Sequence, residues 1–157
     1  MSLTRLLILS CLLASLLSCR YGFVPEGSLA GKAIELEPTV NRTYLGEAGL
    51  VLDSQLERAF SDLGLLARKE AQQRLSCSIV SAGSERTTVG STTSLDRYRL
   101  TIRVHVRLSD TSGRIVWQET FSDRGAFSEG NQDEDALDEA CRKISLQIAR
   151  AVAALTP

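Results

Sequence analysis

The feature that most constrains the fold of this chain is a strict alternation of apolar and other residues at positions 95–108. A period of two is typical of a β-strand with one face buried and the other turned outward. The buried face would carry Tyr98, Leu100, Ile102, Val104, Val106 and Leu108. The outward face would carry Arg97, Arg99, Arg103, His105 and Arg107, which we call the arginine stripe. The fold must therefore bury one side of this strand and leave a positively charged side facing outward.

The N-terminal residues predict export and lipidation. Arg5 precedes an apolar run at residues 6–17. A helix over this run would span about 18 Å, which is short of the ~30 Å hydrocarbon core of a membrane, so we interpret residues 1–18 as a signal peptide. Cys19, preceded by Ser18, resembles the lipid-bearing cysteine of the bacterial lipoprotein box, so we expect cleavage before it and lipidation of this cysteine. The alternative is a plain secretory signal peptide that contains a cysteine.

The predicted location is the outer membrane. Two or three acyl chains on Cys19 would anchor the protein almost permanently, while the domain itself stays in water. Arg20 stands where an Asp would tend to retain a lipoprotein in the inner membrane. Residues 19–31 are punctuated by Gly and Pro and are predicted to be a lipidated tether. Residues 32–157 are predicted to be a single domain that faces the periplasm.

The predicted domain contains four strands and two helices. Alternating or apolar segments predict strands at residues 32–37, 74–83, 95–108 and 114–121. Apolar residues spaced by three or four predict helices over residues 52–63 and 131–155. Gly64 would end the first helix, and Asn131 with Glu134 would begin the second as a capping box. Residues 81–94 are rich in Ser, Thr and Gly and are interpreted as a long hairpin end.

The order strand, helix, strand, strand, strand, helix predicts an α+β fold. We expect a two-layer sandwich in which two helices pack on one face of a four-stranded mixed β-sheet. The first two strands flank a helix and would run parallel through a right-handed crossover, whereas the later strands would be antiparallel. The other face of the sheet would then stay uncovered.

Composition and motifs argue against nucleic-acid binding and against catalysis. The chain of 157 residues has a formal net charge of −1 and is 43% hydrophobic, so it lacks the excess of positive charge that nucleic-acid binding needs. It contains one His and neither a zinc-binding nor a nucleophile motif. We therefore predict a protein that is not an enzyme and that needs no cofactor and no metal.

Three smaller features have structural interpretations. Cys77 and Cys141 are both predicted to face the core, and two buried free thiols are favoured over a disulfide, which the periplasm would permit. Asn41, Arg42 and Thr43 form a glycosylation sequon that we treat as a chance match. Trp117 alternates with Ile115 and Phe121 and is interpreted as a core residue and not as a ligand platform.

Several stretches, taken in order, resemble the LptE family of lipopolysaccharide-assembly lipoproteins. They are "SCRYGF" around the predicted lipidation site, "NRTYLGEAGLVLDSQLERAF" with its Tyr and amphipathic helix, and "YRLTIRVHVRLSDTSGRIVWQETF" with its Asp-x-x-Gly turn and Trp-bearing strand. The Ala-rich C-terminal helix also fits the family. The resemblance spans nearly the whole chain after the signal peptide.

The resemblance implies a role that is not enzymatic. Members of the family sit in the lumen of the outer-membrane barrel LptD as a plug, help it fold and let lipopolysaccharide pass to the outer leaflet, and some bind lipopolysaccharide directly. The implied partners are an LptD-like β-barrel, lipopolysaccharide, and outer-membrane lipid through acylated Cys19, with no nucleic acid. No ligand-binding residues are carried over from the family.

Two interpretations of the arginine stripe stay open. Side chains on one strand face recur at ~6.8 Å, so the stripe would be roughly 34 Å long. It could contact an anionic surface, such as lipid A phosphates or an acidic barrel wall, because the Arg fork suits phosphates and carboxylates. Alternatively, Glu35, Glu37 and Glu119 on neighbouring strands pair with some of these arginines, and the stripe is a solvated face. We predict the interaction surface.

The leading functional hypothesis is thus an outer-membrane lipoprotein that assists lipopolysaccharide assembly as plug and folding partner of an LptD-like barrel. The alternative is a free-standing, periplasm-facing outer-membrane lipoprotein that serves as a binding or secretion-accessory module for another partner. The absence of nucleophile–base motifs disfavours a hydrolase.

Overall fold

The computed structural model describes residues 33–67, 70–87, 97–128 and 133–155. The predicted signal peptide, Cys19 and the predicted tether lie outside these residues. The described elements, in chain order, are β1 (Ile34–Leu36), β2 (Val40–Asn41), α2 (Ala48–Asp62), β3 (Gln73–Thr87), β4 (Arg97–Asp110), β5 (Ile115–Ser128) and α3 (Asp133–Ala154).

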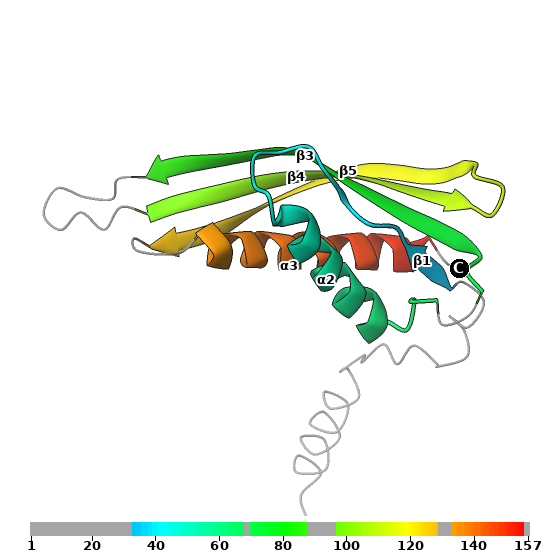
Figure 1. Ribbon diagram of the computed structural model, residues 1–157. Coiled ribbons are helices and arrows are strands. Elements are labelled where there is room, and N and C mark those ends of the chain that lie inside the picture. Colours follow the sequence, from blue (N-terminus) through cyan, green and yellow to red (C-terminus); the bar gives the residue numbers. More distant parts are fainter. Residues whose placement is uncertain (1–32, 68–69, 88–96, 129–132, 156–157) are drawn as a thin grey trace, which may run out of the picture.

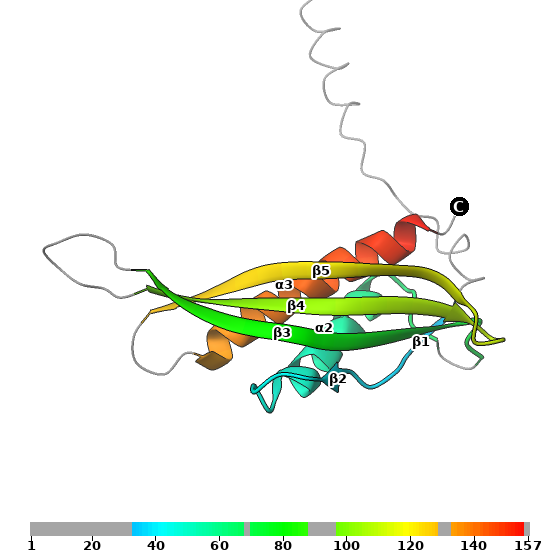
Figure 2. The same cartoon turned by 90° about the horizontal axis from the view of Figure 1, so that it is seen from above.

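The strands form one mixed sheet, and the predicted α+β sandwich is confirmed. The strand order is β1-β3-β4-β5, and the short β2 also pairs with β3. Both β1 and β2 run parallel to β3, whereas β3, β4 and β5 are antiparallel neighbours. Helices α2 and α3 lie on the same side of the sheet (Figure 1). Figure 2 is the view from above, and in it the strands lie in front of both helices. No described element covers this outer face of the sheet.

The sheet is larger than the sequence predicted. The two-residue β2 is an additional strand between β1 and α2. Strand β3 runs on to Thr87 and strand β5 to Ser128, so part of the segment predicted as a hairpin end is strand; residues 88–96 lie outside the described residues. Pairing with β4 along its whole length explains both extensions, because the ladder satisfies the backbone whatever the side chains are.

The hydrophobic core fills the space between the sheet and the helices. On β4, the alternation predicted a buried face, and the five apolar side chains from position 100 to 108 are each at most 3 % exposed. Opposite them lie the apolar faces of the two helices: Leu52, Leu56 and Phe60 of α2, and Cys141, Ile144, Ile148 and Val152 of α3. Leu63 and Leu155, which continue the helical spacing in the sequence, are instead 38 % and 43 % exposed.

Gly64 ends helix α2, as predicted. It has a positive φ of 67°, a conformation that costs little only without a Cβ. The backbone N–H of Gly64 donates to the carbonyl of Ser61, and the N–H of Leu65 donates to the carbonyl of Phe60, both at 2.9 Å. These two bonds form a Schellman motif, which satisfies carbonyls that the last helical turn would leave unpaired.

Gly125 on β5 allows α3 to approach the sheet. A Cβ built on Gly125 would overlap the backbone carbonyl of Ala136, in the first turns of α3. Ala136 is itself completely buried. A residue without a side chain on the strand and a small residue on the helix thus set the separation of the two layers at this end of the sandwich.

Two irregularities shape the sheet. The pairing of β3 with β4 shifts register between Ile79 and Ser81, and the pairing of β4 with β5 shifts between Leu108 and Ser109. Such bulges increase the local right-handed twist. The turn between β4 and β5 contains the predicted "DTSG" and is closed by Gly113, whose φ is 82°.

Candidate functional site

The arginine stripe lies on the outer face of the sheet. Arg99, Arg103 and Arg107 of β4 are exposed and His105 is half-buried, while the residues between them are buried or half-buried. The strand alternation predicted from the sequence is therefore confirmed for these four residues. The backbone of Arg97 belongs to β4, but its side chain lies outside the described part of the structure.

Small polar residues flank the stripe on both neighbouring strands. In the register of the sheet, His105 lies between Ser78 and Thr120, and Arg103 lies between Ser81 and Ser122. Ser and Thr side chains are short, so they leave the longer guanidinium groups standing above the surface. The hydroxyl of Thr120 contacts His105, and that of Ser122 donates to the carbonyl of Ile102 at 3.1 Å.

Two further arginines extend the positive surface. Arg124 of β5 lies opposite Thr101, which is on the same face of β4. Arg42 directly follows β2, and its backbone N–H donates to the carbonyl of Ile79 at 3.0 Å. The positively charged or basic side chains of this surface, which we call the basic face, are Arg42, Arg99, Arg103, His105, Arg107 and Arg124.

The carboxylates that were candidates to neutralise the stripe do not pair with it, although Glu35 lies on the same outer face, beside Arg74. Glu35 pairs with Arg74 at 3.1 Å, and Glu119 faces the helix side of the sheet, opposite Val106. The other ion pairs within the described residues are Arg114–Asp110 and Lys143–Glu139, neither of which involves the basic face. The alternative interpretation, in which Glu35, Glu37 and Glu119 pair with the stripe, is therefore wrong within the described residues.

A second carboxylate also lies on the outer face, close to the stripe. Glu85 of β3 lies opposite Arg99 in the register, and it is exposed. Within the described residues, no carboxylate lies within ion-pair distance of Arg99, Arg103 or Arg107. Their positive charge is therefore available to an external anion.

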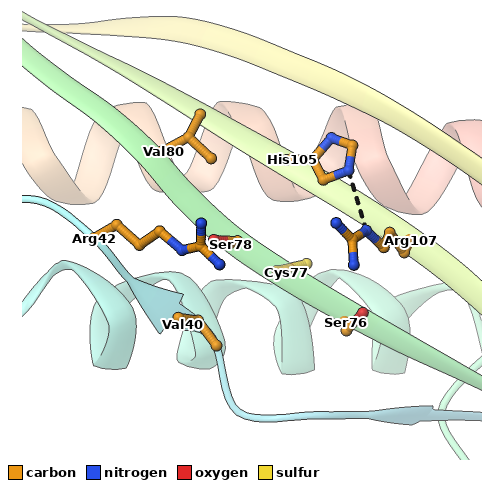
Figure 3. A pocket seen from close by; sticks show the side chains of 8 residues that line it. All are labelled: Val40, Arg42, Ser76, Cys77, Ser78, Val80, His105 and Arg107. Atoms are coloured by element: carbon orange, nitrogen blue, oxygen red, sulfur yellow. Dashed lines mark hydrogen bonds between the residues drawn. The ribbon is translucent and has the colours of Figure 1, made fainter.

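His105 links the stripe to β5. Arg107 Nε donates to His105 Nε2 at 3.2 Å, so this ring nitrogen acts as the acceptor (Figure 3). His105 Nδ1 lies 3.2 Å from Thr120 Oγ1 and is then the nitrogen that carries the proton and donates. The contact holds the guanidinium of Arg107 beside the imidazole and restricts its rotamers. Sequence reasoning placed both residues on one face but had no means of finding this contact.

A shallow hollow of about 150 Å³ lies on the basic face where β2 meets β3 and β4. Figure 3 shows Arg42 on one side of Ser78, with His105 and Arg107 on the strand at the other side. Val40 and Val80 also line the hollow, on opposite sides of Ser78 in Figure 3, and they are 53 % and 40 % exposed. The hollow thus combines cationic and apolar groups, which suits an anion that carries a hydrophobic part.

Arg42 and Val40 were missed by the sequence analysis because β2 was not predicted. Two residues are too few to show a period, so no pattern in the sequence could place them on the outer face. Ser78 Oγ is also buried in this region and has no hydrogen-bond partner in the described part of the chain.

The segment that carries Arg42 is held by Asn41. Its Oδ1 accepts hydrogen bonds from the N–H and the hydroxyl of Thr43 at 2.9 and 2.8 Å, and its Nδ2 donates to the carbonyl of Leu45. Asp53 of α2 supports the same segment by accepting the N–H of Thr39 at 3.0 Å. The apparent sequon thus has a structural explanation, because the Asn side chain closes the turn between β2 and α2.

Replacing Asn41 by Ala should destabilise the protein by about 1–3 kcal/mol, because it leaves half-buried backbone groups without partners. Urea unfolding would measure this change. The control is Arg42→Ala, which removes an exposed side chain and should change stability little. Equal effects of the two variants would contradict the role assigned to Asn41.

The two cysteines among the described residues, Cys77 and Cys141, are part of the hydrophobic core. Both Cys77 and Cys141 are buried and free, as the favoured interpretation predicted. Burial raises the pKa of the Cys77 thiol to about 12, with a smaller contribution from the negative charge of Asp53. Burial likewise raises the pKa of Cys141 to about 12. Neither thiol is therefore ionised near neutral pH, so neither is suited to act as a nucleophile or a metal ligand.

Two further observations concern metals and membranes. No group of three or more potential metal-ligating side chains occurs among the residues that the structure describes. In the same residues, neither helix is both long enough and apolar enough to cross a membrane.

Comparison with known families identifies the chain. The model of the family LptE, described as "Lipopolysaccharide-assembly", matches residues 31–152. This chain belongs to the LptE family. The match covers the whole described fold except its last residues, and it confirms the resemblance seen in the sequence. LptE proteins are non-enzymatic lipoproteins, in agreement with the predicted absence of catalysis.

Solved structures support the fold. This LptE-family chain is similar to a protein of Caulobacter crescentus CB15 described as a lipoprotein, with a TM-score of 0.60 and 19% sequence identity, over 83% of this chain and 94% of that one. It is also similar to a minor lipoprotein from Acinetobacter baumannii, with a TM-score of 0.52 and 15% identity, over 78% of this chain and 93% of that one. No curated protein sequence matches the chain.

Proposed function

We propose that this LptE-family protein is an outer-membrane lipoprotein, anchored through Cys19, that acts in lipopolysaccharide assembly as plug and folding partner of an LptD-like β-barrel. Membership of the family supports the process. The observation that supports a contact with an anionic partner is the basic face. No described element covers this sheet surface, and within the described residues its arginines have no carboxylate partner.

The basic face has the chemistry of a contact surface for anions. Arginine binds phosphates and carboxylates through two parallel hydrogen bonds, and several arginines on one rigid sheet can engage several such groups together. A sheet face also keeps these groups in fixed relative positions, which a loop would not. We propose that the partner is the phosphorylated lipid A part of lipopolysaccharide or an acidic stretch of the barrel wall.

The hollow beside Arg42 fits the same proposal. A phosphate bound by Arg42 or Arg107 would have the apolar side chain of Val40 or Val80 within the same hollow for its attached group. Lipid A joins phosphates to a hydrophobic body, so its chemistry matches both the cationic and the apolar residues of the hollow. An acidic peptide would use the arginines and leave the two valines unused.

The experiment that tests the proposed partner is purification of the tagged, lipidated protein from native envelopes in a mild detergent. We expect a large β-barrel to accompany it at equal stoichiometry, and we expect depletion of that barrel to lower the level of this protein. A Cys19→Ser variant is the control for anchoring, since it should lose membrane attachment while keeping its affinity for the barrel. A protein that purifies alone and persists without the barrel would instead support a free-standing lipoprotein.

A further inference from the structure

Strand β5 forms one edge of the sheet, because the strand order is β1-β3-β4-β5. In an antiparallel sheet, alternate residues of an edge strand direct their backbone N–H and C=O groups away from the neighbouring strand. Arg124 and Ala126 are two such residues, since their outward groups bond to side chains that do not belong to β4. The same alternation places the outward groups of Gln118, Thr120 and Ser122 at this edge.

The end of β5 that contains Arg124 and Ala126 is protected by side chains. Glu139 of α3 accepts the N–H of Ala126 at 3.0 Å, and Lys143 of α3 donates to the carbonyl of Arg124 at 3.0 Å. Asp123 accepts the N–H of Arg124 at 2.7 Å. These bonds satisfy the N–H groups of Arg124 and Ala126 and the carbonyl of Arg124, so another strand cannot pair there without displacing them.

The other half of the edge is open. The outward backbone groups of Gln118, Thr120 and Ser122 have no hydrogen-bond partner in the described part of the chain. No Pro or Lys occurs on β5 to discourage pairing. Natural proteins usually block an exposed edge, because it offers a row of free donors and acceptors to another chain. Protection of one half of β5 only therefore points to a use for the other half.

Helix α3 would lie beneath a strand added at the β5 edge and could pack against it. The helix crosses beneath the sheet, and its C-terminal half runs out past the β5 edge (Figures 1 and 2). Gln147 of α3 donates to Asp123 of β5 at 2.6 Å, and Ala151, one turn further along the same side of the helix, is only half-buried. On the helix side of β5, the rings of Trp117 and Phe121 are also half-buried, with centroids 6.1 Å apart. An added strand could thus bury apolar side chains that are now partly in water.

We propose that the open half of the β5 edge takes up an extended segment of a partner protein as an additional β-strand above α3. This proposal goes beyond the proposed function and does not depend on it. The segment would direct alternate apolar side chains towards α3, and it would carry a Lys or Arg next to Glu119. Glu119 is exposed on the helix side of β5, and within the described residues it forms no ion pair.

A second copy of the domain is a poor occupant of the same edge. Pairing two copies through β5 would bring the helix layer of each copy beneath the sheet of the other. Because α3 already projects past the edge, it would occupy the space that the partner's helices need. A single extended segment has no helix layer and avoids this overlap. Recognition of this kind draws affinity from main-chain hydrogen bonds and specificity from alternate side chains.

The test uses a defined probe, a short synthetic peptide of alternating Val and Thr with a central Lys. Hydrogen exchange of the purified protein, followed by NMR, should show slower exchange of the amides of Gln118, Thr120 and Ser122 when this peptide is added. Thr120→Pro removes one outward N–H and should weaken binding about tenfold, because one main-chain hydrogen bond is lost at a position where an edge strand tolerates Pro. Thr120→Val keeps the N–H and should bind as the original protein does.

A charge exchange provides a second, independent variant. Glu119→Lys should weaken binding of the Lys peptide and strengthen binding of the same peptide with Glu at its centre. The proposal is wrong if the peptide does not slow exchange at these amides, or if the charge exchange leaves the peptide preference unchanged. It is also wrong if raising the protein concentration alone slows the same amides, since the occupant is then a second copy. If the Thr120→Pro variant does not fold, the peptide preference of the Glu119→Lys variant tests the proposal instead.

Discussion

Replacing Gly125 by alanine should destabilise the protein by about 3 kcal/mol, at the upper end of what overpacking a core usually costs. The added Cβ would overlap the carbonyl of Ala136, and a backbone atom cannot move aside as a flexible side chain can. Strand β5 and the start of α3 would have to separate, and buried contacts would be lost around them. Thermal or urea unfolding would measure the change.

Gly83 provides the matched control, because it is also a glycine within a strand of the same sheet. A Cβ on Gly83 would meet nothing within 4 Å, since this residue is exposed on the outer face. Gly83→Ala should therefore leave the protein as stable as before or stabilise it by about 0.5 kcal/mol, through the lower entropy of the unfolded chain. Similar losses for both variants would show that neither glycine marks a close approach.

Reversing the charge of two arginines on the basic face should weaken the binding of lipopolysaccharide by roughly a hundredfold. Arg103→Glu with Arg107→Glu removes two charge-assisted contacts, each of which contributes about 1.5–3 kcal/mol, and a tenfold change in affinity corresponds to about 1.4 kcal/mol. Both side chains are exposed, and neither pairs with a carboxylate in the described residues. The fold should therefore persist.

Binding to lipopolysaccharide in detergent and association with the barrel would both be measured for this double variant. The control is Arg58→Glu with Arg150→Glu, two exposed arginines on the helices, which changes the net charge by the same amount on the other side of the molecule. If both double variants weaken binding equally, the attraction depends on net charge and not on the basic face. If neither has an effect, the basic face is a solvated surface.

Periodicity in the sequence was enough to predict the faces of the long elements. The alternation over β4 was long enough to place every described member of the arginine stripe on the correct face, and Gly64 marked the end of α2. The same reasoning could have excluded an ion pair between Glu119 and the stripe. Trp117 and Phe121, two residues away on either side of Glu119, were interpreted as facing the core, so Glu119 had to face the same way.

The rest depended on interactions that leave no pattern in the sequence. The two residues of β2 pair with β3 through the backbone, so their side chains carry no signal, and Arg42 could not be added to the basic face. The extension of β3 through Gly83 to Thr87 has few strand-forming residues and depends on pairing with β4. The close approach of Gly125 to Ala136 joins residues on two separate elements, which only the packed structure brings together.

The register shift between Ile79 and Ser81 lies opposite the middle of β4, between the positions of Arg99 and Arg107. Because strands twist and a bulge adds to the twist, we expect these two arginines, near opposite ends of β4, to project along different directions. A flat layer of lipid headgroups could touch only part of such a saddle-shaped surface at one time. Separate anionic groups, each approaching along its own direction, could occupy all of it.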